Sequence, residues 1–530
     1  MDNDKSTAQH VDTIESVNDF DHNVPLKHVN SANEEIVQHL QTTGEEVGMT
    51  WRTFMAAASM AMCYNAYLFT LLIPPAILTF INADLGPDPR YFFLAGAVLL
   101  IIDKEIVPSK YRHVTIGVFD ASSLIAQMMP LISWIIIKET KNWRICYYIM
   151  IAFQTINLAM LFFFYHPPSF KVKQAQHGKS KRQLLQEFDW IGLFLFIAGC
   201  TLFIVGISWG GTLYPWVSGT TLAPIIVGLL TLVGMVVYEN FTTLKEPLFP
   251  PRLFRAKRHF TTPMLVMAIG GMQYYSNATL WPRLSQLLYA GDETSKGLFA
   301  SVLPLGTIIG GIIVSFSKYI GHQRWQVMFA VALQTACVGA MSTATIGNSV
   351  QSIILTCIIS VTTSVNILNG MVLVGFGIVY QEDIGTAAGL AGTSRLLAGA
   401  VATAIFSNVT NNKYATSLPS AVLANVSSFN LPGATLAKLI AAAKANTAAA
   451  YAAVPGITPA IKAAASLGNK QAYLQGAHLS YQVALAFGLL GVICAFFIPS
   501  IDHRKYTDRT VAVQQRDREE LEERKMAGGA

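Results

Sequence analysis

The sequence predicts an all-α polytopic membrane protein, and three observations support this fold class. The 530 residues are 52% hydrophobic and 13% charged, with a mean hydropathy of +0.43, whereas a soluble domain carries about 25% charged residues. Apolar runs recur along the chain, and several reach the length of about 20 residues that a membrane-spanning helix needs. Basic residues gather in alternate loops, as the positive-inside rule predicts for the cytoplasmic side.

A central hairpin in residues 166–260 sets the orientation of the other spans. Apolar runs at residues 190–207 and 222–238 are joined by the uncharged turn SWGGTLYPWVSGTT and flanked by basic loops. We expect the basic loops on the cytoplasmic side and the aromatic turn at the outer interface. Glu239 ends the second run beside a basic loop, and we interpret it as a structural residue. The net charge of +6 reflects this topology, so we expect no nucleic-acid partner.

The chain before the hairpin divides into two predicted regions. Residues 1–48 are acidic and polar, typical of a disordered cytoplasmic N-terminus. Residues 49–165 form an N-terminal helix bundle with spans at 51–81, 114–137 and 143–165.

A short apolar stretch at residues 91–102 lies between the first two of these spans. As a helix it would reach about 18 Å, against about 30 Å of hydrocarbon. Prolines bound it on one side and charged residues on the other. It is therefore too short to cross the membrane unaided. If it does cross, both predicted ends of the chain are cytoplasmic.

The chain after the hairpin is predicted to form a C-terminal bundle at residues 261–408, an outer loop, a last helix at 479–501 and a charged cytoplasmic tail at 502–530. The predicted spans of this part are residues 261–281, 298–317, 325–346, 352–380, 386–408 and 479–499. The extracellular loop at 409–478 is Ala-rich, and we expect short helices in it. Asn425 begins the triplet Asn-Val-Ser there, a predicted glycosylation site.

Several motifs occur in an order that resembles a known family. They are NWRICYYI, FDWIG, EPLFPPRLFRAKRHF, GLFASVLPLGTIIGG and GTAAGLAGTSRLLAGAVATAIF. Together they resemble the major facilitator superfamily, in its fourteen-span drug:proton antiporter branch. This resemblance implies a two-bundle fold with an extra central helix pair. The stretch EIVPSKYRHVTIGVFDASSLIAQMMPLISW is most similar to the fungal trichothecene efflux pumps and their siderophore-transporter relatives.

The chain departs from that family pattern in its first bundle. Members have four helices before the span at residues 114–137, whereas this chain has one span and the short stretch. By this comparison, helix 2, most of helix 3 and helix 4 are missing, so the first bundle is incomplete. The two joins fall at motif edges, which indicates lost exons or a mistaken gene model.

Polar residues inside the predicted spans of the first half are candidates for the substrate or proton pathway, because burying them in lipid is costly. Asn65 and Tyr67 either line a cavity or make helix-packing hydrogen bonds. Asn65 stands where the family commonly has an acid, and it cannot titrate. Asp120 is either a proton-accepting carboxylate or an acid fixed in a helix contact. Gln127 lies on the same helical face two turns later.

The second half offers a further set of candidates. Amide and aromatic side chains suit a rigid, oxygen-bearing terpenoid, although an interfacial aromatic belt or helix packing would use the same residue types. Arg395 lies well inside its span and needs a partner or a water-filled cavity. The candidates in this half are Gln273, Tyr274, Asn277, Asn366, Asn369 and Arg395.

The combined prediction is a proton-coupled efflux transporter, and not an enzyme. It would export a trichothecene-like sesquiterpenoid or another hydrophobic small molecule by alternating access. The sequence has no phosphate-binding Gly-rich loop with a lysine and no metal-ligand spacing, so we expect no cofactor. We expect a monomer in the lipid bilayer of the plasma membrane, with the vacuolar membrane as an alternative. The alternative functions are siderophore or metabolite transport and a truncated product that does not transport.

Overall fold

The computed structural model describes residues 123–500 except 165–185, 187, 212, 243, 245–246, 256, 378–382, 430 and 447, together with residues 62 and 65. These residues form helices, with one isolated bridge between Gly210 and Tyr214. Among them, eight helices are long and apolar enough to cross a membrane. The predicted disordered ends, the short stretch at 91–102 and the missing helices of the first bundle lie outside the described residues.

Helices α5 (Leu124–Gln127), α6 (Met129–Thr140) and α7 (Arg144–Phe164) represent the first half. The predicted span at 114–137 is interrupted within its described part, since α5 and α6 meet at Met128. Pro130 lies two residues after Met128, and its ring cannot fit against the preceding turn of an uninterrupted α-helix.

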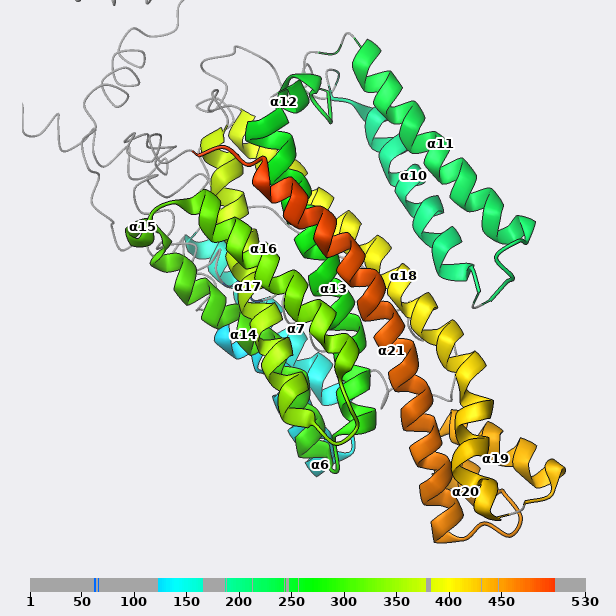
Figure 1. The fold of residues 1–530 in the computed structure, drawn as a ribbon. Helices are drawn as coiled ribbons and strands as arrows, with labels where there is room; N and C mark the ends of the chain where they lie inside the picture. Colours follow the sequence, from blue (N-terminus) through cyan, green and yellow to red (C-terminus); the bar gives the residue numbers. More distant parts are fainter. Residues whose placement is uncertain are drawn as a thin grey trace, which may run out of the picture. The chain divides into compact units, whose positions relative to one another are not determined.

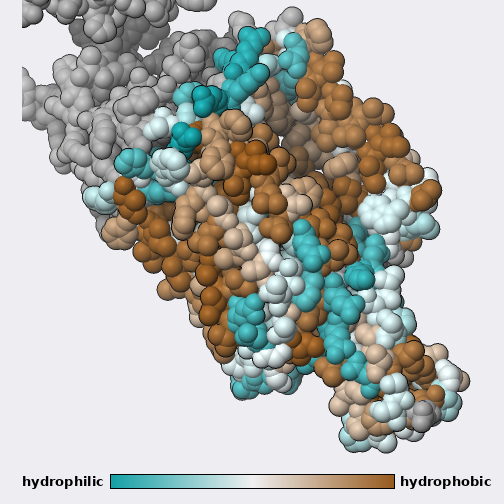
Figure 2. All heavy atoms as spheres, in the orientation of Figure 1, coloured by the Kyte–Doolittle hydropathy of each residue, from teal (hydrophilic) through white to brown (hydrophobic). Residues whose placement is uncertain are grey.

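The hairpin consists of α10 (Trp190–Trp209) and α11 (Gly219–Phe241), close to the two predicted runs. Its helices approach each other through glycines: a Cβ added to Gly228 would lie 2.5 Å from the backbone nitrogen of Phe203. The outward faces are apolar and exposed, and Figure 2 shows hydrophobic residues over the hairpin at the upper right. This arrangement is typical of helices in contact with lipid.

The tip of the hairpin contacts the C-terminal part of the chain. The side-chain amide of Asn408 donates a hydrogen bond to the carbonyl oxygen of Ile207. A pocket of about 390 Å³ lies beside this contact. Its lining residues are Trp216, Ile405, Asn408, Val409, Asn412, Lys413, Thr416 and Leu479.

Six long helices form the part that we call the C-terminal bundle (Figure 1). They are α13 (Thr262–Leu288), α14 (Glu293–Ser315), α16 (Gln323–Ala340), α17 (Ser349–Gly377), α18 (Asp383–Val426) and α21 (Pro459–Phe496). Helix α13 packs against α14, α17, α18 and α21, and α16 packs against α17 and α21. Trp281, Phe406 and Tyr481 are fully buried in its main core.

Short helices connect these elements. Before α13 come α12 (Pro251–Arg255) and a π-helical turn at Lys257–Thr261. Helix α15 (Ser317–Ile320) precedes α16, and a 3₁₀ turn at Met341–Thr343 follows α16.

The predicted loop at 409–478 contains more helix than the short helices expected there. Helix α18 continues through Asn408 to Val426, and α21 begins at Pro459 rather than near residue 479. Only residues 427–458 lie between them, with α19 (Gly433–Ala445) and α20 (Ala448–Ala452). The side of the membrane on which this segment lies stays a prediction.

The physical reason is amphipathic packing between the two helix extensions. Tyr414, Leu418 and Val422, spaced four residues apart on one face of α18, are buried against α21. The Tyr414 hydroxyl donates to Asn469 Oδ1 at 2.8 Å. The polar residues that suggested a loop occupy the opposite face or hydrogen-bond between the helices, so they do not end the helix.

Candidate functional site

A contact that we call the seam joins the first half to the C-terminal bundle, where α5 and α6 pack against α14. Gln127 is buried at the α5 end of the seam. Its Nε2 donates to Thr307 Oγ1 of α14 at 3.0 Å and to Ser123 Oγ at 3.4 Å. The structure therefore places this predicted residue between the two halves, where a substrate pathway is expected.

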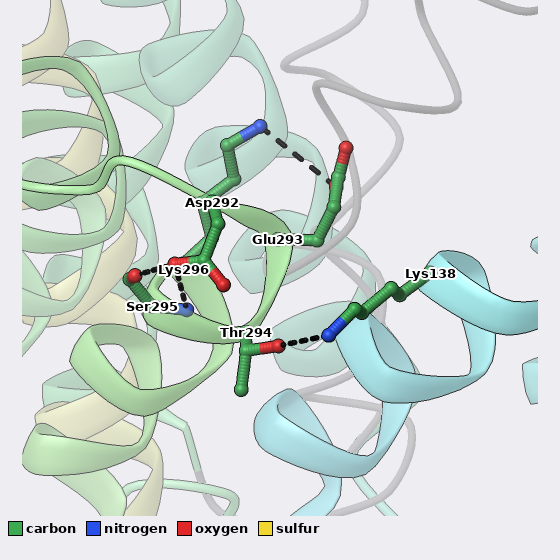
Figure 3. A network of polar contacts seen from close by, with 6 residues as sticks. All are labelled: Lys138, Asp292, Glu293, Thr294, Ser295 and Lys296. Carbon is green, nitrogen blue, oxygen red and sulfur yellow. Dashed lines mark hydrogen bonds and ion pairs between the residues drawn. The ribbon is translucent and has the colours of Figure 1, made fainter.

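The other end of the seam combines close packing with charged groups. A Cβ added to Gly297 would lie 3.0 Å from Leu131 Cα and from Trp134 Cβ. Lys296 Nζ lies 5.0 Å from the centre of the buried Trp134 ring, within the range of a cation–π contact. Lys138 Nζ donates to Thr294 Oγ1 at 3.2 Å (Figure 3). In the predicted topology this end of the seam faces the outside.

Asp292 and Glu293 complete the network in Figure 3. Asp292 caps α14 by accepting hydrogen bonds from the backbone and the hydroxyl of Ser295. These bonds favour the ionised carboxylate, so they lower the pKa of Asp292 below its ordinary value. Glu293 lies 4.0 Å from Lys296 in an ion pair.

The predicted amides of α13 point into the C-terminal bundle. Gln273 Nε2 donates to Thr335 Oγ1 of α16 at 3.1 Å, and Asn277 Oδ1 accepts from the Tyr481 hydroxyl of α21 at 2.9 Å. Both amides are buried. These bonds join α13 to helices of the same bundle, which favours the helix-packing interpretation over substrate contact.

Gln334 of α16 belongs to the same buried layer and was not predicted. Its Nε2 donates to the carbonyl oxygen of Gly270 at 3.2 Å and to Thr363 Oγ1 at 2.8 Å. The signal for it in the sequence was a lone amide inside an apolar span. Asn366 of α17 is buried beside it and lies against Gly270.

Asn369 of α17 joins the turn between α14 and α16. Its Oδ1 accepts from Ser317 Oγ at 3.0 Å, and its Nδ2 donates to Gln326 Oε1 at 3.2 Å. The bonds of Asn369 therefore favour a structural role at one end of the bundle.

Arg395 of α18 lies across α13. Its guanidinium carbon lies 5.9 Å from the ring centre of Tyr275, and a Cβ added to Gly271 would meet Arg395 Cγ at 2.7 Å. Tyr274 packs edge-on against Tyr275, with ring centres 5.3 Å apart. The aromatic partner that Arg395 requires inside a span is thus Tyr275.

The remaining predicted residues are divided between described and undescribed parts. Tyr67 and Asp120 lie outside the described residues, whereas Asn65 is described and buried. Asn425 lies in the last turn of α18, where its Nδ2 donates to the Ala421 carbonyl at 2.8 Å and to Gln471 Oε1 at 2.7 Å. Its glycosylation stays a prediction. Within the described part of the chain, no three His, Cys, Asp or Glu side chains cluster closely enough to hold a metal ion.

Residues 57–530 match the model of the fungal trichothecene efflux pump (TRI12) family. The chain belongs to this family. The match extends across the seam, the hairpin and the C-terminal bundle, and it confirms the predicted family and the all-α membrane fold class.

The relatives of this chain that carry names are transporters. The chain is 30% identical to trichothecene efflux pump TRI12 of Fusarium sporotrichioides over 68% of its own length and 61% of that pump. It is 27% identical to MFS-type transporter prx5 of Penicillium rubens over 77% of its own length and 74% of that transporter. It is 28% identical to the TRI12 pump of Trichoderma arundinaceum over 68% and 61% of the two chains.

The match therefore spans somewhat less than two thirds of the Fusarium and Trichoderma pumps. A solved bacterial homologue of the human lysosomal transporter spinster overlaps 82% of this chain and 96% of its own at 14% identity, with a TM-score of 0.38. A likeness of that degree supports no structural argument. Family membership and the apolar helices together make the chain a multi-pass membrane protein.

Proposed function

We propose that the chain is an efflux transporter that moves a hydrophobic small molecule across the plasma membrane by alternating access. The observation that carries the proposal is the family match over residues 57–530. Several relatives are named as efflux pumps or MFS-type transporters, and none of those reported above is named as an enzyme.

The character of the seam supports a transport cycle. Alternating access requires the two halves to separate at one end and close at the other. Across the seam, the polar contacts include the Gln127–Thr307 and Lys138–Thr294 hydrogen bonds and the Lys296–Trp134 contact. Each such contact contributes about 1 kcal/mol, a small cost for a conformational change.

The proposed substrate is a trichothecene-like sesquiterpenoid. The Fusarium and Trichoderma relatives are named for trichothecene efflux. We favour Gln127, Tyr274 and Arg395 as substrate contacts. Gln127 bonds across the seam. Arg395 is half-buried and lies beside Tyr275, whose ring packs against Tyr274. Asn65, Tyr67 and Asn366 remain candidates, and Gln273, Asn277 and Asn369 are better explained as packing residues.

Proton coupling is proposed to use Asp120. It is the acid inside the predicted span that ends in α5 and α6, and a carboxyl group is the kind of side chain that can carry a proton through a transport cycle. Asn65 cannot serve in this way. We propose that the chain acts as a monomer.

The test is export from yeast cells that express the full chain. They should retain less of a labelled trichothecene than cells with an empty vector, and a protonophore should remove the difference. Asp120→Asn should abolish export at equal surface abundance, whereas the exposed control Glu139→Gln should leave it unchanged.

Each alternative gives a different outcome. Uptake of labelled ferric siderophore without trichothecene export would replace the proposed substrate and direction. Abundant surface protein with neither flux would show a truncated, non-transporting product. Unchanged export in Asp120→Asn would refute coupling through that residue alone.

A further inference from the structure

Two acidic residues meet at the base of the α10–α11 hairpin, far along the helices from the tip at Trp216. Asp189 directly precedes α10, and Glu239 lies in the last turn of α11. Their side chains are 2% and 3% exposed. The backbone nitrogens of two successive residues, Leu248 and Phe249, each donate to one of the carboxyl groups, which brings the two acids side by side.

Backbone N–H groups hold both carboxyl groups in place. Asp189 Oδ1 accepts from the Gly192 nitrogen at 2.7 Å, and its Oδ2 accepts from the Leu248 nitrogen at 3.4 Å. Glu239 Oε1 accepts from the Phe249 nitrogen at 3.1 Å. The pair therefore fastens both hairpin helices to residues 247–250, which lead into α12.

Within the described part of the chain, no ion pair joins Asp189 or Glu239 to a lysine or an arginine. Helices α10 and α11 carry no charged side chain other than Glu239, and the next helix, α12, carries Arg252 and Arg255. Lys245 and Glu246 lie outside the described residues. Helix α18, which packs against α10, carries Arg395 and Lys413 among its described side chains.

One oxygen of the pair needs a donor. Glu239 Oε2 is buried, and no N–H or O–H group of the described residues donates to it. Two buried carboxylates in contact repel each other when both are ionised. A single proton bound to one of them turns repulsion into a hydrogen bond, and it also satisfies the unpartnered oxygen.

We propose that Asp189 and Glu239 form a proton-binding site. One proton shared by the two carboxyl groups holds the base of the hairpin in contact with residues 247–250, which lead to the C-terminal bundle. The proton comes from solvent and forms an O–H bond on one carboxylate, which donates to the other. Loss of this proton leaves two like charges in contact and releases residues 247–250. The inference does not depend on whether the chain transports.

The first test is infrared spectroscopy of the full chain in lipid nanodiscs near neutral pH. The wild-type protein should show the carbonyl-stretch band of a protonated carboxylic acid. Glu239→Gln and Asp189→Asn should each lose that band, whereas Glu139→Gln, which changes an exposed acid, should keep it. A wild-type spectrum without the band would overturn the proposal, as would a difference spectrum between the wild type and folded Glu239→Gln in which no carboxylic-acid band is lost.

The second test uses the wild-type chain and does not depend on a variant folding. Hydrogen exchange at the Leu248 and Phe249 amides, corrected for the intrinsic effect of pH, should accelerate once the pH exceeds the value at which the pair loses its shared proton. Release of one proton predicts about a tenfold loss of protection per pH unit. In Glu239→Gln the same amides should show no such slope. Equal, pH-independent protection in both proteins would exclude a proton-controlled contact.

Discussion

The α10–α11 hairpin and the α14–α17 pair are both strongly apolar, but their residues are buried to very different extents. In the most apolar stretches, mean hydropathy is 2.4 and 2.2 in the hairpin and 2.1 and 1.8 in α14 and α17. Yet 28% and 17% of those hairpin residues are buried, against 61% and 67% in α14 and α17. Hydropathy therefore identifies a membrane span without telling whether lipid or protein surrounds it.

The glycines explain how the two regions differ. Added Cβ atoms at Gly306 and Gly310 of α14 would meet Ser360 and Ser364 of α17. In the hairpin, Gly234 has nothing within 4 Å. Close packing on several sides requires small residues, and a face in contact with lipid does not.

The largest expected difference concerns two tryptophans. Trp281 is fully buried and donates from Nε1 to the Phe299 carbonyl at 2.6 Å, whereas Trp216 is partly exposed at the hairpin tip. Trp281→Ala should lower the free energy of unfolding by about 3–5 kcal/mol. Trp216→Ala should lower the free energy of unfolding by much less. Thermal unfolding in detergent measures both, and equal losses would contradict the comparison.

A matched pair of glycine substitutions should give the next largest difference. A Cβ at Gly310 would lie 2.5 Å from both Val361 O and Ser364 Cβ. Gly310→Ala should therefore destabilise the protein by about 1–3 kcal/mol. Gly234→Ala, the same change at an open position, should be neutral or slightly stabilising because Ala favours helix. Similar melting temperatures for both variants would show that the α14–α17 contact can relax.

Removing the Tyr481 hydroxyl tests a single buried hydrogen bond. Tyr481→Phe leaves Asn277 Oδ1 without its donor, which should cost about 1–3 kcal/mol of unfolding free energy. Tyr238→Phe in the hairpin is the control, because Tyr238 is only half-buried and its hydroxyl makes no hydrogen bond to another described residue. A loss in the control as large as in Tyr481→Phe would refute the role of the buried bond.

The smallest effect is expected at Asp292, which is exposed. Its lowered pKa means that the ionised form stabilises the fold. The contribution is present above the unfolded-state pKa and disappears as pH falls through the lowered folded-state value. Asp292→Asn should reduce the melting temperature slightly at neutral pH and converge with wild type in strong acid. A difference that grows on acidification would have the wrong sign.

Local sequence patterns predicted some elements well and others poorly. The hairpin helices were placed within a few residues, because their apolar runs end at basic loops and an uncharged turn. The extension of α18 was missed because polarity was taken as the end of a span. Its buried face depends on α21, and the Tyr414–Asn469 bond joins residues that are distant in the sequence.

Prediction of the candidate site from the sequence meets the same limit. Polar residues inside spans could be recognised from the sequence, but the direction of each side chain could not. Gln273 and Gln127 belong to the same class of residue, yet one bonds within the C-terminal bundle and the other bonds across the seam. That difference depends on helix rotation, which is set by packing partners far along the chain.

The length of α18 and α21 has a mechanical consequence. With 44 and 38 residues, they reach about 66 Å and 57 Å, against about 30 Å of hydrocarbon. Their paired extensions, with α19 packed against both, form a rigid lever arm. When the C-terminal bundle tilts, the end of this arm moves farther than the middle of the bundle. A spectroscopic label at the exposed Lys444 would therefore report small rotations as large displacements, and the arm would serve as an alignment feature in electron-microscope images.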